Sequence, residues 1–156
     1  MKIRKAKKKD FEEYFKLEKE FCKYNNKITP FIKCALIKKK IKKNFTRKLN
    51  KKNKIFLVID DGKNLQGYLF GEIEYLNKYG YKYNLDKRGY LENTYITEKY
   101  RGQGYFFKMF KQFIAYLKKH KIKYCALHVE TNNKKSIKTY ESIGFKIDSH
   151  RMTKRL

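Results

Sequence analysis

A turn with an arginine and two glycines precedes the most regular helical pattern in the chain. The segment YRGQGYFFKMF, residues 100–110, contains Arg101, Gly102, Gln103 and Gly104, and apolar residues recur at helical spacing after them. The first amides of a helix have no partner within the helix, and the helix dipole adds partial positive charge there. Such a turn can bind phosphate. These residues also allow a plainer interpretation, a tight strand-to-helix connection with an exposed arginine.

A second motif lies farther along, in LHVETNNKKSIKTYESIGF. Its spacing is V-x-x-x-N-x-x-S-x-x-x-Y-x-x-x-G-F, from Val129 to Phe145. Taken with the arginine and glycine turn, which follows a strand ending near Ile96, this motif resembles the GNAT superfamily of acyl-CoA-dependent N-acyltransferases. The resemblance covers essentially the whole chain. One residue departs from the pattern, because Phe106 stands where the family usually has a second glycine or alanine.

The resemblance implies a binding site for acetyl-CoA. The main chain of Thr94 and Ile96 would pair with the pantetheine arm as an added strand does. The pyrophosphate would be wrapped by Arg101, Gly102, Gln103, Gly104, Tyr105 and Phe106. Asn133 would bond the pantetheine or order the adjoining loop, although it could equally be a helix N-cap, a role that Asn132 could also fill.

Tyr140 and Glu92 are the candidate catalytic residues. The resemblance implies that Tyr140 lies near the thioester sulfur and donates a proton to the departing thiolate. Otherwise Tyr140 is a core tyrosine of an amphipathic helix. An alkylamine is mostly protonated at neutral pH, so a base must accept its proton, and Glu92 is the candidate on the strand that leads into the turn. Glu92 could instead pair with a lysine across the sheet.

Other chemically capable side chains give weaker signals. Glu72 and Glu74 share a face of one strand and could hold a cationic amine or face water. His128 is a lone strand histidine, which is more often structural than catalytic. No spacing of histidines or cysteines predicts a metal site, and no Ser/His/Asp grouping occurs.

The three cysteines, Cys22, Cys34 and Cys125, are odd in number and widely spaced. They predict neither a disulfide framework nor a zinc knuckle, and Cys125 is expected to be inert in a buried strand. A reducing compartment follows as an expectation. No apolar run approaches the length of a membrane span, so we expect a cytoplasmic protein.

The charge of the chain is extreme. It carries 41 Lys+Arg and 15 Asp+Glu, a formal net charge of +26, which attracts polyanions such as nucleic acid. The basic residues are almost all lysine, and Asn, Ile, Tyr and Phe are abundant, which is the residue set of A- and T-rich codons. The charge is therefore explained as well by coding bias and solvated faces as by a nucleic-acid surface.

The elements that must position these residues follow from periodicity and capping signals. The length of 156 residues predicts one domain over residues 1–156, and the resemblance implies that it is an acetyltransferase domain. We predict an α/β fold of the order β-α-α-β-β-β-α-β-α-β, with a mixed, mostly antiparallel sheet flanked by helices. The expected strands are residues 1–6, 54–60, 65–76, 89–96, 124–129 and 145–156.

Helix signals fill the intervals between these strands. Asp10 and Glu13 have capping-box spacing before a first helix that ends near Lys23, and Thr29 caps a second helix beginning at Pro30. A third helix starts at Tyr105, and a short fourth one, residues 133–143, ends at Gly144. Gly67 and Gly71 are possible bulge positions, and residues 77–88 form a long loop.

These inferences combine into one functional hypothesis and a rival. The hypothesis is an acetyl-CoA-dependent N-acetyltransferase, with the cofactor in a V-shaped opening between residues 89–96 and 124–129 and direct attack by an amine. The acceptor is a small molecule or a protein, and a polycation would need a local acidic pocket. The rival is a basic nucleic-acid- or ribosome-associated module of the same fold without turnover. The protein is expected to be a monomer or homodimer without membrane contact.

Overall fold

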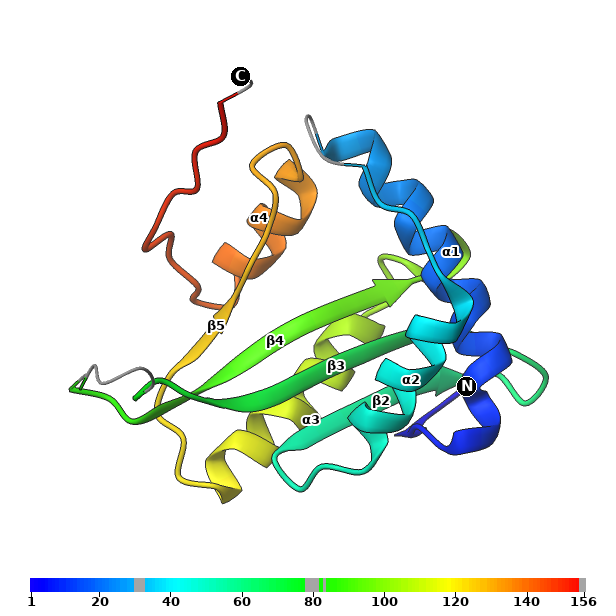
Figure 1. Ribbon diagram of the computed structural model, residues 1–156, viewed down its shortest axis with the longest axis horizontal. Helices are drawn as coiled ribbons and strands as arrows, with labels where there is room; N and C mark the ends of the chain where they lie inside the picture. The colour runs from blue at the N-terminus through cyan, green and yellow to red at the C-terminus, as the bar shows by residue number, and fades with distance from the viewer. Residues whose placement is uncertain (30–32, 78–81, 83, 155–156) are drawn as a thin grey trace.

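The computed structural model describes residues 1–29, 33–77, 82 and 84–154. Its strands form one sheet in the order β1-β2-β3-β4-β5 (Figure 1). The first three pairings are antiparallel, and β4 and β5 are parallel. The bounds are β1 Lys2–Lys5, β2 Lys54–Asp60, β3 Leu65–Tyr75, β4 Lys87–Ile96 and β5 Cys125–Leu127.

Helices cover both faces of this sheet. The four helices are α1 (Phe11–Ile28), α2 (Lys38–Leu49), α3 (Tyr105–Lys119) and α4 (Lys134–Glu141), with short 3-10 helices η1 (Lys8–Asp10) and η2 (Glu98–Tyr100). Helices α1 and α2 share one hydrophobic core with the sheet, and α3 shares a second core with the opposite face. The predicted fold class, a mixed and mostly antiparallel sheet flanked by helices, is confirmed.

The period of two along the strands produces the two cores. Phe56 and Phe70 point toward α1 and α2, whereas Leu57 and Leu69 point toward α3. Glycine allows α3 to approach closely, because a Cβ at Gly71 would lie 2.6 Å from the Phe113 ring. The sequence indicated bulges near Gly67 and Gly71, and register shifts occur beside both.

The second of these register shifts falls on a candidate catalytic residue. Phe70 pairs with Asn93 while Gly71 pairs with Leu91, so Glu92 is the extra residue of a β-bulge. A bulge leaves one residue out of the ladder and bends the strand locally. The fold therefore singles out Glu92 within β4.

The boundary between the first two helices differs from the prediction. Helix α1 continues to Ile28, beyond Lys23, and Thr29 is its C-cap in extended conformation, whose N–H donates to the Asn25 carbonyl at 2.9 Å. A residue that precedes proline is disfavoured in helical conformation, which explains a helix end at Thr29. The prediction that Thr29 caps a second helix is wrong. Pro30 lies outside the described residues, as does part of the loop 77–88.

The start of α1 is correct, but its capping contact is different. Asp10 makes no side-chain cap for α1. Its carboxylate instead accepts the Lys7 N–H at 2.7 Å, which closes η1, and it forms two hydrogen bonds with Arg4 at 2.7 and 2.9 Å. Arg4 also donates to Asp60 at 2.8 Å, so the arginine joins β1 to η1 and β2.

The last predicted strand does not form. Residues 145–154 have no strand conformation, and β5 spans only Cys125–Leu127 within the predicted strand 124–129. A strand of this kind is stabilised by burying one face. Beyond Phe145 the apolar side chains of the terminal segment do not do so, because Ile147 is 65% and Met152 is 93% exposed.

The cysteine prediction is also wrong in one respect. Cys22 in α1 and Cys34 form a disulfide, with Cα atoms 5.6 Å apart. The chain returns past α1 after Thr29, which brings together two cysteines that their spacing did not pair. Asn26 fixes this return, because its amide group bonds both the N–H and the carbonyl of Cys34. The cysteine pattern therefore gives no support for a reducing compartment.

Candidate active site

The strands β4 and β5 separate at the point where the predicted site lies. Their parallel pairing covers Gly89–Leu91 and Cys125–Leu127. Strand β4 continues to Ile96, paired with β3 on its other edge, and β5 turns away toward α4 (Figure 1). Within the described residues, β4 has no strand partner on the β5 side from Glu92 onward. Its main-chain groups on that edge are available to an extended ligand.

A cleft of about 760 Å³ occupies this opening. Its wall contains almost every residue that the sequence assigned to the site, although these residues come from β4, the following turn, α3, α4 and the segment before α4. The predicted residues in the wall are Glu92, Thr94, Ile96, Arg101, Gly102, Gly104, Tyr105, Phe106, Asn133 and Tyr140. Gln103 is the exception, and its amide donates to the Lys99 carbonyl at 2.9 Å.

The turn before α3 presents main-chain amides to the cleft. Gly102 and Gly104 have φ angles of 75° and 76°, in the left-handed region that glycine adopts without strain. Gly104 is the N-cap of α3, and the Lys108 N–H is the donor to its carbonyl at 3.1 Å. A Cβ at either glycine would meet no atom within 4 Å. The turn is thus open on the side where a Cβ would lie, and the helix dipole favours an anion at this helix start.

Phe106 does not belong to the turn. It lies in the first turn of α3, with its ring centroid 5.6 Å from that of Phe110 and 5.7 Å from that of Tyr140. The aromatic ring therefore packs α3 against α4. The departure from the family pattern at this position leaves the two glycines of the turn in place.

Arg101 fastens the turn to its surroundings. Its Nε donates to the Ile96 carbonyl at 2.9 Å. The guanidinium carbon lies 4.9 Å from the Tyr24 ring centroid and 5.3 Å from that of Tyr95. Cation-π contacts of this kind are worth about 0.5–2 kcal/mol each. Arg101 thereby holds the end of β4 against α1.

Asn133 and Tyr24 connect the two sides of the cleft. Asn133 is the N-cap of α4, because its Oδ1 accepts the Ser136 N–H at 3.3 Å. The same oxygen accepts the Tyr24 hydroxyl at 3.3 Å. Asn132 is not the cap, and its amide donates to the Ile28 carbonyl at 3.2 Å. Sequence reasoning missed Tyr24, whose only signal was an aromatic side chain near the end of the first helix.

Tyr140 lies on α4 with its ring against Phe106 and Phe145. Burial, followed by the neighbouring Tyr24, raises the pKa of Tyr140 to about 12. The phenol is therefore protonated at neutral pH, which is the state that a proton donor requires. Within the described part of the chain its hydroxyl has no hydrogen-bond partner, so a ligand in the cleft can use it.

The predicted carboxylates are all paired with basic side chains. Glu92 forms a salt bridge with Lys48 at 2.8 Å, and the Lys48 ammonium lies 4.1 Å from the Phe70 ring centroid. On β3, Glu72 pairs with Lys54, and Glu74 pairs with Arg88 at 3.0 Å. Of these three carboxylates only Glu92 lines the cleft. Glu92 does pair with a lysine, but Lys48 lies on α2 and not on a neighbouring strand, so the predicted cross-strand pairing is wrong.

A group of three side chains that sequence reasoning did not assign lies at the far wall of the cleft. Glu130 Oε1 is 3.6 Å from His128 Nε2 and 3.4 Å from Arg151 Nη2. All three line the cleft.

In the described ranges, no group of three or more His, Cys, Asp or Glu side chains could hold a metal ion. None of the described helices is long and apolar enough to cross a membrane.

The match to known protein families agrees with this geometry. The family model of the acetyltransferase (GNAT) family matches residues 9–145, which is most of the chain. The chain belongs to the GNAT acetyltransferase family. The arginine and glycine turn and the motif from Val129 to Phe145 thus lead to the same family as the match. A search of curated proteins found no match.

Solved structures of other proteins share the fold. A tetramutant of the BH1408 protein from Bacillus halodurans has a TM-score of 0.80 and 21% identity, with 100% of each chain covered. An aminoglycoside 6'-N-acetyltransferase from Acinetobacter haemolyticus has a TM-score of 0.75 and 16% identity, covering 100% of this chain and 99% of that one. A predicted acetyltransferase from Clostridium acetobutylicum, solved with acetyl-CoA, has a TM-score of 0.76 and 19% identity over 99% and 95% of the chains.

Proposed function

We propose that this GNAT acetyltransferase transfers the acetyl group of acetyl-CoA to an amine acceptor by direct attack. The observation that carries the proposal is the single cleft at the separation of β4 and β5. It gathers the free edge of β4, the amides before α3, and the Tyr140 phenol. These groups fit an extended arm, an anion and a leaving thiolate, in that order.

The residues present fit acetyl-CoA, which supplies an acetyl thioester when bound. The main chain of Thr94 and Ile96 would bond the pantetheine arm, and the amides of Gly102, Gly104 and Tyr105 would hold the pyrophosphate. Arg101 would keep this turn in place through Ile96 and Tyr24, and Asn133 would order the loop on the other side. Phe106 would form the apolar wall between the turn and α4.

The proton transfers need a base and an acid on opposite sides of the reacting carbonyl. Glu92, fixed by Lys48 on the bulge of β4, would accept the proton of the incoming ammonium. The free amine would then attack the carbonyl carbon and form the C–N bond. As the C–S bond breaks, the sulfur would take the electron pair and the Tyr140 proton, the acylated nitrogen would lose its second proton to solvent, and the tyrosinate would regain a proton from solvent. No covalent enzyme intermediate is needed.

A tyrosine exchange tests the proposal. Tyr140→Phe should lower turnover roughly 100- to 10,000-fold, because the departing thiolate loses its acid, while acetyl-CoA binding stays close to wild type. The readouts are release of free CoA with a panel of amines and calorimetric titration with acetyl-CoA. Tyr90→Phe is the matched control, since Tyr90 lines the same cleft from β4. An unchanged rate in Tyr140→Phe would rule out Tyr140 as the general acid. Absence of acetyl-CoA binding to the wild type would rule out the proposed function.

A second candidate function, binding of nucleic acid, rests on one observation. No Asp or Glu occurs between Glu20 and Asp60, and α2, which lies in this interval, has three lysines in its first turn against the helix dipole. The apolar side of α2 packs in the core, so only its charged side faces outward, which favours phosphate over an apolar membrane surface. A cytoplasmic location stays a prediction.

The matched test compares two sets of three exposed lysines. Lys39, Lys40 and Lys43 on α2 are changed to Gln in one variant, and Lys111, Lys118 and Lys119 on α3 in the other. If α2 binds nucleic acid, only the first set should reduce the salt dependence of binding to an RNA oligonucleotide, by about one unit of slope per lost phosphate contact. Equal losses would indicate attraction by net charge alone.

A further inference from the structure

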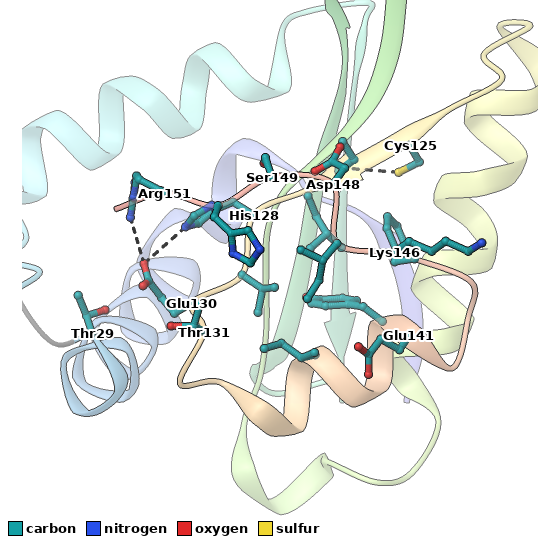
Figure 2. Close-up of a pocket in the computed structure, with 18 of the residues that line it drawn as sticks. Thr29, Cys125, His128, Glu130, Thr131, Glu141, Lys146, Asp148, Ser149 and Arg151 are labelled. Atoms are coloured by element: carbon teal, nitrogen blue, oxygen red, sulfur yellow. Dashed lines mark hydrogen bonds and ion pairs between the residues drawn. The ribbon is translucent and has the colours of Figure 1, made fainter. Parts of the chain in front are cut away.

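A second cavity adjoins the acetyl-CoA cleft. It has a volume of about 480 Å³ and lies between β5, α4 and the terminal segment 145–153 (Figure 2). Its wall shares Leu127, His128, Val129, Glu130, Tyr140 and Arg151 with the cleft. A molecule bound in the second cavity would therefore reach into the acetyl-CoA cleft beside Tyr140, the candidate acid.

Glu130 is the carboxylate at this junction. It lies three residues after the end of β5, and its carbonyl accepts the Asn133 N–H at 2.8 Å, which fixes the turn before α4. In Figure 2 the Glu130 carboxylate faces both Arg151 and His128. Its side chain is 24% exposed, whereas that of Arg151 is 69% exposed. The carboxylate is positioned by the main chain, and its cationic partner comes from a segment without secondary structure.

The contact between Glu130 and Arg151 is loose. Its one hydrogen bond measures 3.4 Å, at the far limit of such bonds. Arg4 and Asp10 offer a contrast within the same chain, because they form two hydrogen bonds of 2.7 and 2.9 Å in a half-buried setting. An exposed ion pair contributes little stability, so a cationic ligand can replace Arg151 at small cost.

We infer that Glu130 binds a second cationic group of the acceptor, so that the preferred substrates are amines with two or more basic nitrogens. The inference rests on the proposed acetyl transfer. The attacking nitrogen must lose its charge before it reacts, so a carboxylate that holds the acceptor throughout the reaction must hold a different, charged nitrogen. Arg151 occupies this position until the acceptor displaces it.

The charge of the second cavity agrees with such a ligand. Its wall contains three carboxylates, Glu130, Glu141 and Asp148, and two permanent cations, Lys146 and Arg151. The balance of three against two makes this wall slightly acidic, with histidines neutral, in a chain whose formal net charge is +26. A dication is therefore repelled less by this wall than the net charge of the chain alone would suggest.

The experiment compares linear alkyl diamines of increasing length with monoamines of the same length, using release of free CoA as the readout. For the best diamine, kcat/KM should exceed that of its monoamine roughly 10- to 100-fold, the usual effect of one charged hydrogen bond. Glu130→Gln should remove most of this ratio. Glu12→Gln is the matched control, because Glu12 is also an ion-paired glutamate, with Lys38 as its partner, but lies outside both cavities, and it should keep the ratio.

Binding without turnover separates this inference from the proposed function. Calorimetry with the diamine and the protein alone should show saturable binding, weakened by Glu130→Gln and strengthened roughly two- to fivefold by Arg151→Ala, which removes the competing cation. A diamine that binds in this way without being acetylated would overturn only the proposed function. Equal kcat/KM for diamine and monoamine, or a ratio kept by Glu130→Gln, would overturn the inference. If Arg151→Ala binds the diamine more weakly than wild type does, Arg151 does not compete with the diamine for Glu130, and this would also overturn the inference.

Discussion

Two regions of this molecule are built in opposite ways. The closed region, consisting of β1 to β4 with α1, α2 and α3, buries its central side chains completely, as Val58, Tyr68 and Phe113 show with 0% exposure. The open region, residues 125–154 with β5 and α4, contains no fully buried side chain. Both cavities border the open region.

The ion pairs follow the same division. In the closed region Arg4 bridges Asp10 and Asp60 with hydrogen bonds of 2.7 to 2.9 Å. In the open region Glu130 holds His128 and Arg151 at 3.6 and 3.4 Å. Well-packed elements supply stability, and loosely packed ones can open for ligands at low cost. The closed region therefore positions one wall of the site, and the open region supplies the wall whose ion pairs are loose.

Alanine substitutions of two phenylalanines, one in each region, measure the difference in packing as a difference in unfolding free energy. Phe113→Ala in α3 should lower the free energy of unfolding by about 3–5 kcal/mol, because the ring is fully buried against the sheet. Phe145→Ala removes the same side chain from the open region, where the ring is half-buried against Phe110 and Tyr140, and should cost about 1 kcal/mol. Guanidinium unfolding gives both values. Similar losses would mean that the two regions are packed alike.

Substitutions of Asp10 and Glu130 compare how much stability the ion pairs of the two regions contribute. Burial alone would raise the pKa of Asp10, but hydrogen bonds from Arg4 and the Lys7 N–H outweigh it and lower that pKa. Asp10→Asn should cost about 2 kcal/mol at neutral pH, and Glu130→Gln less than about 0.5 kcal/mol. Urea unfolding at several pH values checks both.

The pH dependence of the Asp10 contribution has a defined sign. Because the folded pKa is depressed, this stability is fully present above the ordinary pKa of an unfolded aspartate and is lost as pH falls through the lower folded value. Asp60, whose pKa is lowered by the Gly62 N–H and by Arg4, behaves in the same way. As the pH falls below about 4, the free energy of unfolding of Asp10→Asn should therefore decrease less than that of wild type. An identical acid profile for the two proteins would contradict this account.

Two glycines separate a binding role from a folding role. Gly104 before α3 and Gly62 in the β2–β3 turn both have positive φ angles, 76° and 96°, and a Cβ at either would meet nothing within 4 Å. Alanine at each should cost about 1 kcal/mol of stability from backbone strain. Only Gly104→Ala should weaken acetyl-CoA binding, roughly tenfold, by displacing an amide from the anion. Equal acetyl-CoA affinities of Gly104→Ala and Gly62→Ala by calorimetry would show that the turn before α3 is not part of the cofactor site.

Local patterns predicted most of the elements. Strict spacing located α3 at Tyr105, and the apolar run KIFLVID gave the bounds of β2. Patterns failed where a distant contact or the following residue decided the outcome. Thr29 ends a helix because of its neighbour, Asp10 turns to Arg4 rather than to α1, and Cys22 meets Cys34 only after the chain folds back.

The sequence by itself determined the family, the arginine and glycine turn before α3, and ten of the residues that line the cleft, because these depend on short motifs with fixed spacing. Only the tertiary structure decided what each side chain contacts. It paired Glu92 with Lys48, directed Arg101 to Ile96 and Tyr24, and brought Glu130 to the junction of two cavities. These contacts join elements far apart in the chain, and their energies depend on burial and distance, which no local pattern encodes.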